Sequence, residues 1–112
     1  MKFDKNLISC FNIFKRIQIS YEPDILGFDE SIWHKILGHD LFVTRTGVLL
    51  LIHLENPENG EEYTYSFPDI IKVELANSSN SHEKWYLYSL DRSKFKEDIR
   101  NEEMIYRLIF SK

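Results

Sequence analysis

Two spacings of hydrophobic residues follow one another along the first third of the chain. Apolar side chains recur three or four positions apart over residues 3–14, which predicts an amphipathic helix. Every second residue is apolar over residues 17–21, which predicts a half-buried strand that ends before Pro23. Helical spacing returns over residues 29–38, where Gly38 stands at the place of a C-terminal glycine. We therefore expect a second, short helix there.

The middle of the chain carries the signals of consecutive antiparallel strands. The run 48–55 is apolar on both faces as far as His53, so it is expected to form a central strand. Asn59-Gly60 tolerates positive φ angles and predicts a hairpin after that run. Further strands are predicted over residues 41–46, 61–67, 70–75 and 85–90.

The last third of the chain completes the expected fold class. Residues 91–100 have helical spacing. Residues 103–110 either continue that helix or form a last strand; alternation of Met104, Tyr106, Leu108 and Phe110 favours the strand. Together these predictions describe an α+β fold in a single domain spanning residues 1–112. It has a largely antiparallel sheet of about five to seven short strands, an N-terminal helix and one or two short helices.

Charge is distributed unevenly along the chain. The formal net charge is −4, from 14 Lys and Arg and 18 Asp and Glu. Residues 55–83 hold seven of the acids and one base, whereas residues 1–20 hold four bases and one acid. A concentrated negative charge repels phosphate backbones and attracts basic proteins, so we expect no nucleic-acid partner and favour a basic protein partner.

The compartment is predicted from the cysteine content and the N-terminus. Cys10 is the single cysteine, so no internal disulfide forms, which favours a reducing compartment. The first ten residues do not have the pattern of a signal peptide, and the apolar run 48–52 is too short to span a bilayer. We expect a cytoplasmic protein without a membrane partner; its oligomeric state is left open.

No motif in the chain names a reaction or a cofactor. His34, His39 and Asp40 are too few for a zinc site, and we interpret the two histidines as surface residues beside a helix end. Cys10 lies on the apolar stripe of the first helix and is interpreted as a small buried hydrophobe. Glycine-rich phosphate loops and calcium loops are absent. We therefore expect no metal, no cofactor and no catalytic residue.

Two features around the Asn59-Gly60 turn point to binding. Acidic residues flank the turn, and two tyrosines follow on alternate positions of the next strand. Acids beside tyrosines are typical of a surface that binds a basic protein, although acids on a hairpin tip also serve solubility. The candidate partner-binding residues are Glu55, Glu58, Glu61, Glu62, Tyr63 and Tyr65.

The leading hypothesis is a small acidic inhibitor that caps a basic partner such as a nuclease toxin. Small size, acidity and a cytoplasmic location are typical of immunity proteins and antitoxins. Two alternatives remain: a small hydrolase or nuclease that uses His53 or His82, and a structural subunit that adds a strand edge to a larger assembly.

Overall fold

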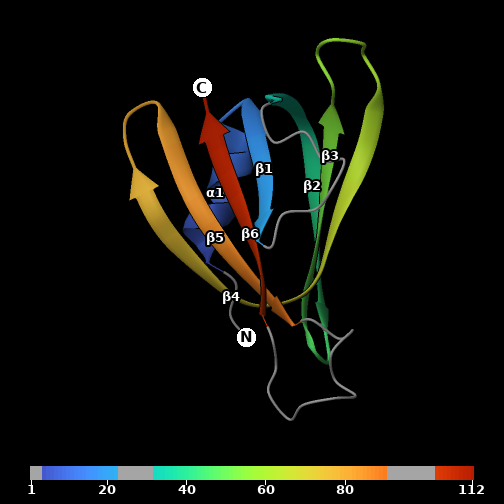
Figure 1. Ribbon diagram of the computed structural model, residues 1–112, viewed down its shortest axis with the longest axis vertical. Helices are drawn as coiled ribbons and strands as arrows, with labels where there is room; N and C mark the ends of the chain where they lie inside the picture. The colour runs from blue at the N-terminus through green and yellow to red at the C-terminus, as the bar shows by residue number, and fades with distance from the viewer. Residues whose placement is uncertain (1–3, 23–31, 91–102) are drawn as a thin grey trace.

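The computed structural model describes residues 4–22, 32–90 and 103–112. In these residues one helix precedes six antiparallel strands, which pair in chain order and close into a barrel (Figure 1). The predicted class, an N-terminal helix on a largely antiparallel sheet, is confirmed. The elements are α1 (Lys5–Ile13), β1 (Arg16–Glu22), β2 (His34–Thr44), β3 (Gly47–Glu55), β4 (Glu62–Ser78), β5 (His82–Leu90) and β6 (Glu103–Ser111).

The N-terminal helix forms as predicted and crosses the barrel. The Asp4 carboxylate accepts a hydrogen bond from the Asn6 amide at 2.8 Å and thereby caps the helix. On its buried face, the Phe11 ring stacks on His39 of β2 at 4.7 Å and meets Phe110 of β6 edge-on at 5.2 Å. The apolar stripe of α1 therefore ties the two sides of the barrel together.

The prediction of a second helix over residues 29–38 is wrong where the structure describes that segment. Residues from His34 onward lie in β2 and pair with β3. The register runs from Ile36 opposite Leu54 to Gly38 opposite His53, so Leu37 is the extra residue of a bulge. A bulge interrupts strict alternation, and two consecutive apolar residues then resemble a helical face. Residues 29–31 lie outside the described residues, as does the helix predicted over 91–100.

Two predicted strands, 61–67 and 70–75, are one long strand with a bend. β4 continues through Pro68, and Asp69 adopts a positive φ of 57°. The Asp69 carboxylate accepts a hydrogen bond from the Thr46 hydroxyl, which holds the bend against the β2–β3 turn. A Cβ atom on Gly47 would lie 2.5 Å from the Ile70 carbonyl oxygen, so only glycine permits this approach.

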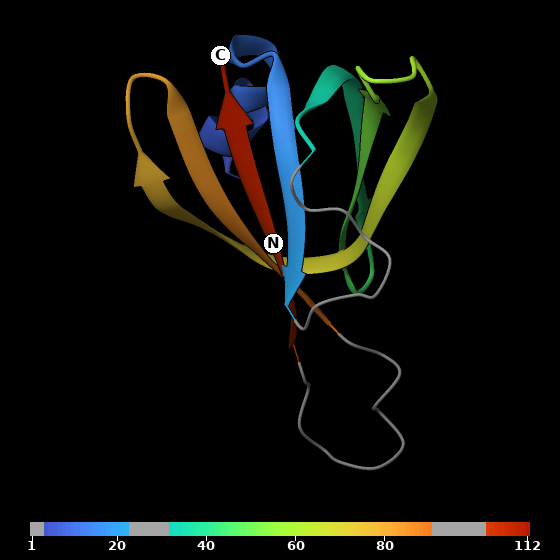
Figure 2. The same ribbon diagram turned by 45° about the horizontal axis from the view of Figure 1, so that its top comes forward.

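Because of this bend, β4 supplies one strand to each of two hairpins. Its first half pairs with β3 and its second half with β5. Figure 2 shows that the tips of both hairpins lie at the same end of the barrel, on either side of α1. The predicted strands 48–55 and 85–90 are confirmed, and residues 103–110 are strand rather than helix.

The seam that closes the barrel is short. β1 and β2 share two residue pairs, Arg16 with Lys35 and Ile17 with His34, whereas β1 and β6 share seven. The core lies inside the barrel and is mostly aliphatic and aromatic. Its buried apolar residues are Leu7, Cys10, Phe11, Phe14, Ile17, Ile19, Val48, Leu50, Ile52, Leu54, Phe67, Ile70, Trp85, Leu87, Tyr106, Leu108 and Phe110.

Candidate functional site: an acidic hairpin tip

The turn between β3 and β4 is built by two asparagines and a glycine. The Asn56 amide donates to the Glu61 carbonyl at 2.8 Å, and the Gly60 amide donates to the Asn56 carbonyl at the same distance. The side-chain oxygens of Asn56 and Asn59 accept hydrogen bonds from the backbone amides of Glu58 and Glu61 respectively, each at 2.9 Å. Gly60 has a φ of 73°, as the Asn-Gly signal predicts. Backbone groups and asparagines thus complete the turn.

The glutamate side chains take no part in that turn. Glu58, Glu61 and Glu62 are exposed and Glu55 is half-buried. None of these four carboxylates forms an ion pair with a cation of the described residues. We call these four glutamates the acidic tip. Their charges are therefore available to a partner.

Two acids of the acidic tip face each other across the sheet. Glu55 of β3 is the register partner of Glu62 of β4, and Lys35 of β2 lies opposite Glu55 on its other side. Like charges in directly opposed positions destabilise a sheet. The hairpin thus keeps an arrangement that works against its own stability, with a single base next to it in the register.

The predicted tyrosines lie on the inner face of β4 rather than on an open surface. Tyr63 and Tyr65 are half-buried, pack against the core and contact each other edge-on at 5.5 Å. Tyr63 also meets the buried His34 edge-on at 5.4 Å, and Tyr65 stacks on Phe67 at 6.1 Å. These rings support the hairpin from inside the barrel, and only part of each ring is open to contact.

The environment of these rings raises the pKa of both phenols. Burial, and then the charge of Glu61, raise the pKa of Tyr63 above its usual value of 10. Burial, and then Tyr63, raise the pKa of Tyr65 to about 12. Both side chains are therefore neutral hydrogen-bonding groups at physiological pH, directly beneath the acidic tip.

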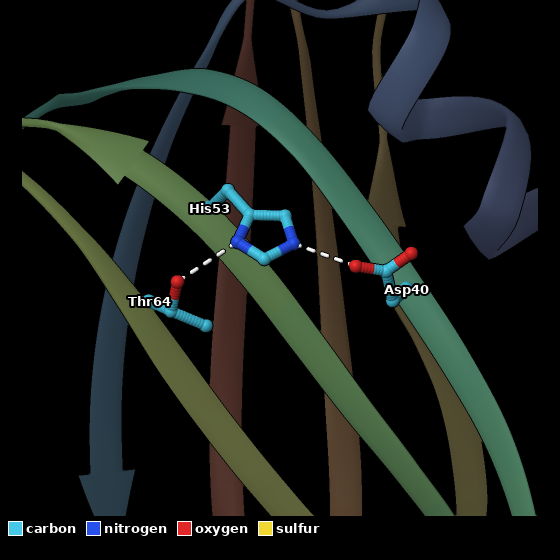
Figure 3. Close-up of polar contacts among 3 residues, drawn as sticks. All are labelled: Asp40, His53 and Thr64. Carbon is cyan, nitrogen blue, oxygen red and sulfur yellow. Dashed lines mark hydrogen bonds and ion pairs between the residues drawn. The ribbon is translucent and has the colours of Figure 1, made fainter.

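A row of polar contacts that the sequence did not reveal lies on the outer face of β2, β3 and β4 (Figure 3). His53 Nε2 lies 2.7 Å from Asp40 Oδ2, and His53 Nδ1 lies 2.8 Å from Thr64 Oγ1. Asp40, His53 and Thr64 come from β2, β3 and β4 respectively. An acid, a histidine and a hydroxyl in this order are the residue types of a nucleophile with its base and orienting group.

The surroundings of the Asp40–His53–Thr64 contacts differ from those of an enclosed active site. The side chains of His53 and Asp40 are 36% and 54% exposed on an open sheet face. Asp40, His53 and Thr64 do not line the hollow beside the β2–β3 turn or the hollow on β1, β5 and β6. His82, the other histidine of the enzyme hypothesis, has different partners: Ser81 Oγ at 2.9 Å and the Trp33 ring at 5.9 Å.

The residues weighed for metal or thiol chemistry lie elsewhere. His34 is 3% exposed on β2, and His39 is half-buried against Phe11, so their interpretation as surface histidines beside a helix end is wrong. No group of three metal-ligating side chains occurs within the described ranges. Cys10 is buried as predicted; burial, and then the nearby Glu83 carboxylate, raise its pKa to about 12, so it remains a thiol at neutral pH.

Comparisons with known proteins add no family to this picture. No family model, no curated protein and no solved structure matches the chain. The one helix in the part of the chain that the structure describes is too short to cross a membrane.

Proposed function

We propose that this protein is a non-enzymatic binding protein whose acidic tip caps a basic protein partner, in the manner of immunity proteins and antitoxins. The observation that carries the proposal is the separation of roles in the β3–β4 hairpin. Asn56, Asn59 and Gly60 build the turn, while three of the four glutamates around it are exposed and none of the four makes an ion pair within the described residues.

The chemistry of such a partner follows from the charge. The acidic tip lies at the end of a hairpin, which enters a concave surface more readily than the face of the sheet does (Figure 1). A basic cleft that normally binds phosphates would accept these carboxylates in their place. In this proposal the carboxylates of the acidic tip imitate the phosphates of a nucleic acid, and the target is a basic enzyme such as a nuclease toxin.

The tyrosines have a smaller role than their spacing suggested. Tyr63 stands beside Glu61 and keeps part of its ring accessible, so it serves as an anchor at the edge of the contact. Tyr65 lies deeper and mainly supports the hairpin. The protein acts in the cytoplasm in this proposal, where a single reduced Cys10 is compatible with the environment.

The test begins with capture of the partner from native lysate, followed by binding kinetics with the purified partner. The Glu61→Lys/Glu62→Lys variant should associate at least about tenfold more slowly than wild type at low salt, because it reverses the steering field. The control is Glu74→Lys, a single charge reversal. It reverses an exposed acid on the other half of β4, and its association rate should stay within about twofold of wild type, because a distant exposed charge is largely screened.

A second candidate function is supported by the Asp40–His53–Thr64 contacts. In a small hydrolase, Thr64 would be the nucleophile, His53 the base and Asp40 the orienting group. Thr64→Val and His53→Gln would each abolish activity of the purified protein toward a panel of ester and phosphodiester substrates. If the wild-type protein turns over no substrate of this panel, the hydrolase candidate is contradicted and binding is kept as the proposed function.

A further inference from the structure

One edge of β2 has few strand partners in the part of the chain that the structure describes. On one side β2 pairs with β3 as far as Thr44, whereas on the other side it pairs with β1 only at His34 and Lys35. A further backbone hydrogen bond, from the Ile36 amide to the Lys15 carbonyl at 2.9 Å, lies beside that short pairing. Within the described ranges, this edge of β2 is therefore open over residues 38–44, and an open edge presents unpaired amides and carbonyls.

The open edge of β2 carries apolar side chains on both faces of the sheet. Leu41 and Val43 belong to the inner face, because their register partners on β3, Leu50 and Val48, are buried in the core. Leu41 and Val43 are nonetheless 36% and 79% exposed, and Phe42 on the outer face is 51% exposed. Three consecutive exposed apolar residues on an open strand edge are typical of a surface that pairs with another strand.

The second half of β4 has an open edge of a different kind. From Lys72 onward this strand pairs with β5 alone among the described residues; its register with β5 shows two irregularities, and Lys72 and Glu74 lie on it. Bulges and charged side chains, lysine above all, discourage pairing at a strand edge. Over residues 38–44, β2 has a regular register and no lysine or proline, and its one carboxylate, Asp40, contacts His53 on the neighbouring strand. The edge of β2 therefore lacks the features that prevent pairing.

The charges at the two ends of this edge complement each other. The sequence of residues 40–45 begins with Asp40, continues with three apolar residues and a threonine, and ends with Arg45. Arg45 is exposed and forms no ion pair with the described residues, and the side chain of Asp40 is 54% exposed beside His53. Antiparallel pairing of two identical segments brings the acidic end of each to the basic end of the other. The segment is therefore complementary to a second copy of itself.

A register centred on Phe42 brings these features together. A two-fold axis perpendicular to the sheet keeps the inner faces of both copies on the same side, so opposed residues share a face. Phe42 then lies beside Phe42 of the second copy on the outer face, and Leu41 lies opposite Val43 of the second copy on the inner face. Asp40 reaches the end of the other strand that carries Arg45. Each exposed apolar side chain is thus covered by an apolar side chain of the second copy.

We propose that the open edge of β2, residues 38–44, pairs with the same edge of a second copy of this chain to form an antiparallel two-fold dimer. The strands β2, β3 and β4 of both copies then join in one continuous sheet, in which backbone hydrogen bonds supply affinity and the apolar side chains supply specificity. The acidic tip lies on the far side of β3 from this edge, so the dimer carries two acidic tips and does not depend on the proposed function.

The first experiment is sedimentation velocity of the purified protein over a series of concentrations. Wild type should shift reversibly from one chain to two as its concentration rises, and hydrogen exchange at the amides of residues 38–44 should slow in parallel. Val43→Lys should weaken the dimer by about tenfold or more, because it places a lysine in the apolar contact from each copy. The matched control is Leu75→Lys, an exposed apolar position on the half of β4 that pairs with β5; its dimerisation should stay within about twofold of wild type.

A charge-reversal pair tests the two-fold register itself. Asp40→Lys brings two bases together at each end of the paired edges, and Arg45→Glu brings two acids together, so each variant alone should dimerise at least about tenfold more weakly than wild type. An equimolar mixture of the two variants restores opposite charges at both ends and should form a mixed dimer about as readily as wild type does. Damage to the fold of either variant would not be repaired by mixing.

Three results would overturn the inference. The wild-type protein stays monomeric at every concentration, or Val43→Lys dimerises as wild type does, or the mixture of the two charge-reversal variants associates no better than either variant alone. A monomer that instead binds an apolar peptide at residues 38–44 would assign the edge to a foreign strand and so also overturn it. The Glu61→Lys/Glu62→Lys variant should dimerise as wild type does. Failure of the dimer is thereby distinguishable from failure of the proposed function.

Discussion

The two hairpins that share β4 end in tips of opposite character. The β3–β4 tip carries the four carboxylates of the acidic tip, whereas the β4–β5 tip, residues 78–82, contains serines, an asparagine and a histidine without Asp, Glu, Lys or Arg. Both tips project from the same end of the barrel (Figure 1). The chain therefore builds a hairpin at this end with or without charge, and the acids are not a requirement of the fold.

Local hydrogen bonds support the same conclusion. In the neutral tip, the Ser79 amide donates to the His82 carbonyl at 2.8 Å, and the Ser79 side chain also bonds to the His82 backbone. In the β3–β4 turn, the side chains of Asn56 and Asn59 accept the corresponding hydrogen bonds from backbone amides. Only the acidic tip places two like charges, Glu55 and Glu62, in direct register. Acids that weaken their own hairpin are better explained by binding than by folding.

The largest loss of stability is expected for a substitution in the core where the two hairpins meet. Phe67 is fully buried just before the bend in β4 and contacts Tyr65 and Tyr106. Phe67→Ala should lower the free energy of unfolding by about 3–5 kcal/mol, because it leaves a cavity in the core. Denaturant melts measure this. The control, Phe42→Ala, truncates a ring that is 51% exposed and should cost less than about 1 kcal/mol. Equal losses would mean that the hairpins do not share a core at Phe67.

A moderate difference in stability should distinguish substitutions in the β3–β4 turn from substitutions in the β4–β5 turn. Gly60 has a φ of 73° with open space where a Cβ atom would lie, so Gly60→Ala meets backbone strain alone. The expected loss is about 1–2 kcal/mol, the cost of the left-handed region for a residue with a side chain. Asn80→Ala in the neutral tip should change stability by about half a kcal/mol or less. If both substitutions were neutral, the acidic hairpin would not depend on its Asn-Gly turn.

Alkaline pH should weaken the acidic hairpin from its inner face. The pKa of Tyr65 is raised to about 12 in the folded protein, above the ordinary value of 10. The unfolded chain therefore ionises first, so the stability associated with this phenol is complete below pH 10 and is lost as the pH rises toward 12. Stability measured across this range should fall less for Tyr65→Phe than for wild type. Identical pH profiles would contradict the half-buried position of this ring.

The smallest expected change in stability is an increase, although most substitutions destabilise a protein. Glu62→Gln removes the like-charge pair with Glu55 and should raise the free energy of unfolding by a few tenths of a kcal/mol, on the order of opposed charges in a sheet. Glu74→Gln, which breaks an exposed pair with Lys72, should leave stability unchanged or slightly lower. Denaturant melts at low salt measure both. A destabilised Glu62→Gln variant would indicate that this acid serves the fold.

How far the sequence predicts this molecule depends on how local each feature is. α1, β1 and β6 follow from the spacing of their apolar residues, and β3 follows from a continuous apolar run. The first part of β2 resembles a helix because the bulge at Leu37 breaks its alternation, whereas residues 41–44 lie in the strand that is predicted over 41–46. β4 is predicted as two strands because Pro68 usually ends a strand. Closure of the barrel depends on the pairing of Arg16 with Lys35, which local patterns do not encode.

The candidate site shows the same division. The position of the acidic tip follows from Asn59-Gly60, and Glu58, Glu61 and Glu62 are exposed as a hairpin tip implies. Alternation groups Tyr63 and Tyr65 on one face, yet it does not say that this face is the inner one. The Asp40–His53–Thr64 contacts join three strands, and only their register brings these residues together.

The most direct test of the central claim is the dependence of the association rate on ionic strength. It compares wild type with Glu61→Gln/Glu62→Gln, using the partner obtained by capture. If the acidic tip steers a basic partner, the wild-type rate should fall steeply as salt rises, and the variant should show a clearly shallower decline from a slower start. Equal rates and equal salt dependence for the two proteins would contradict the account and make the acidic tip a solvated turn.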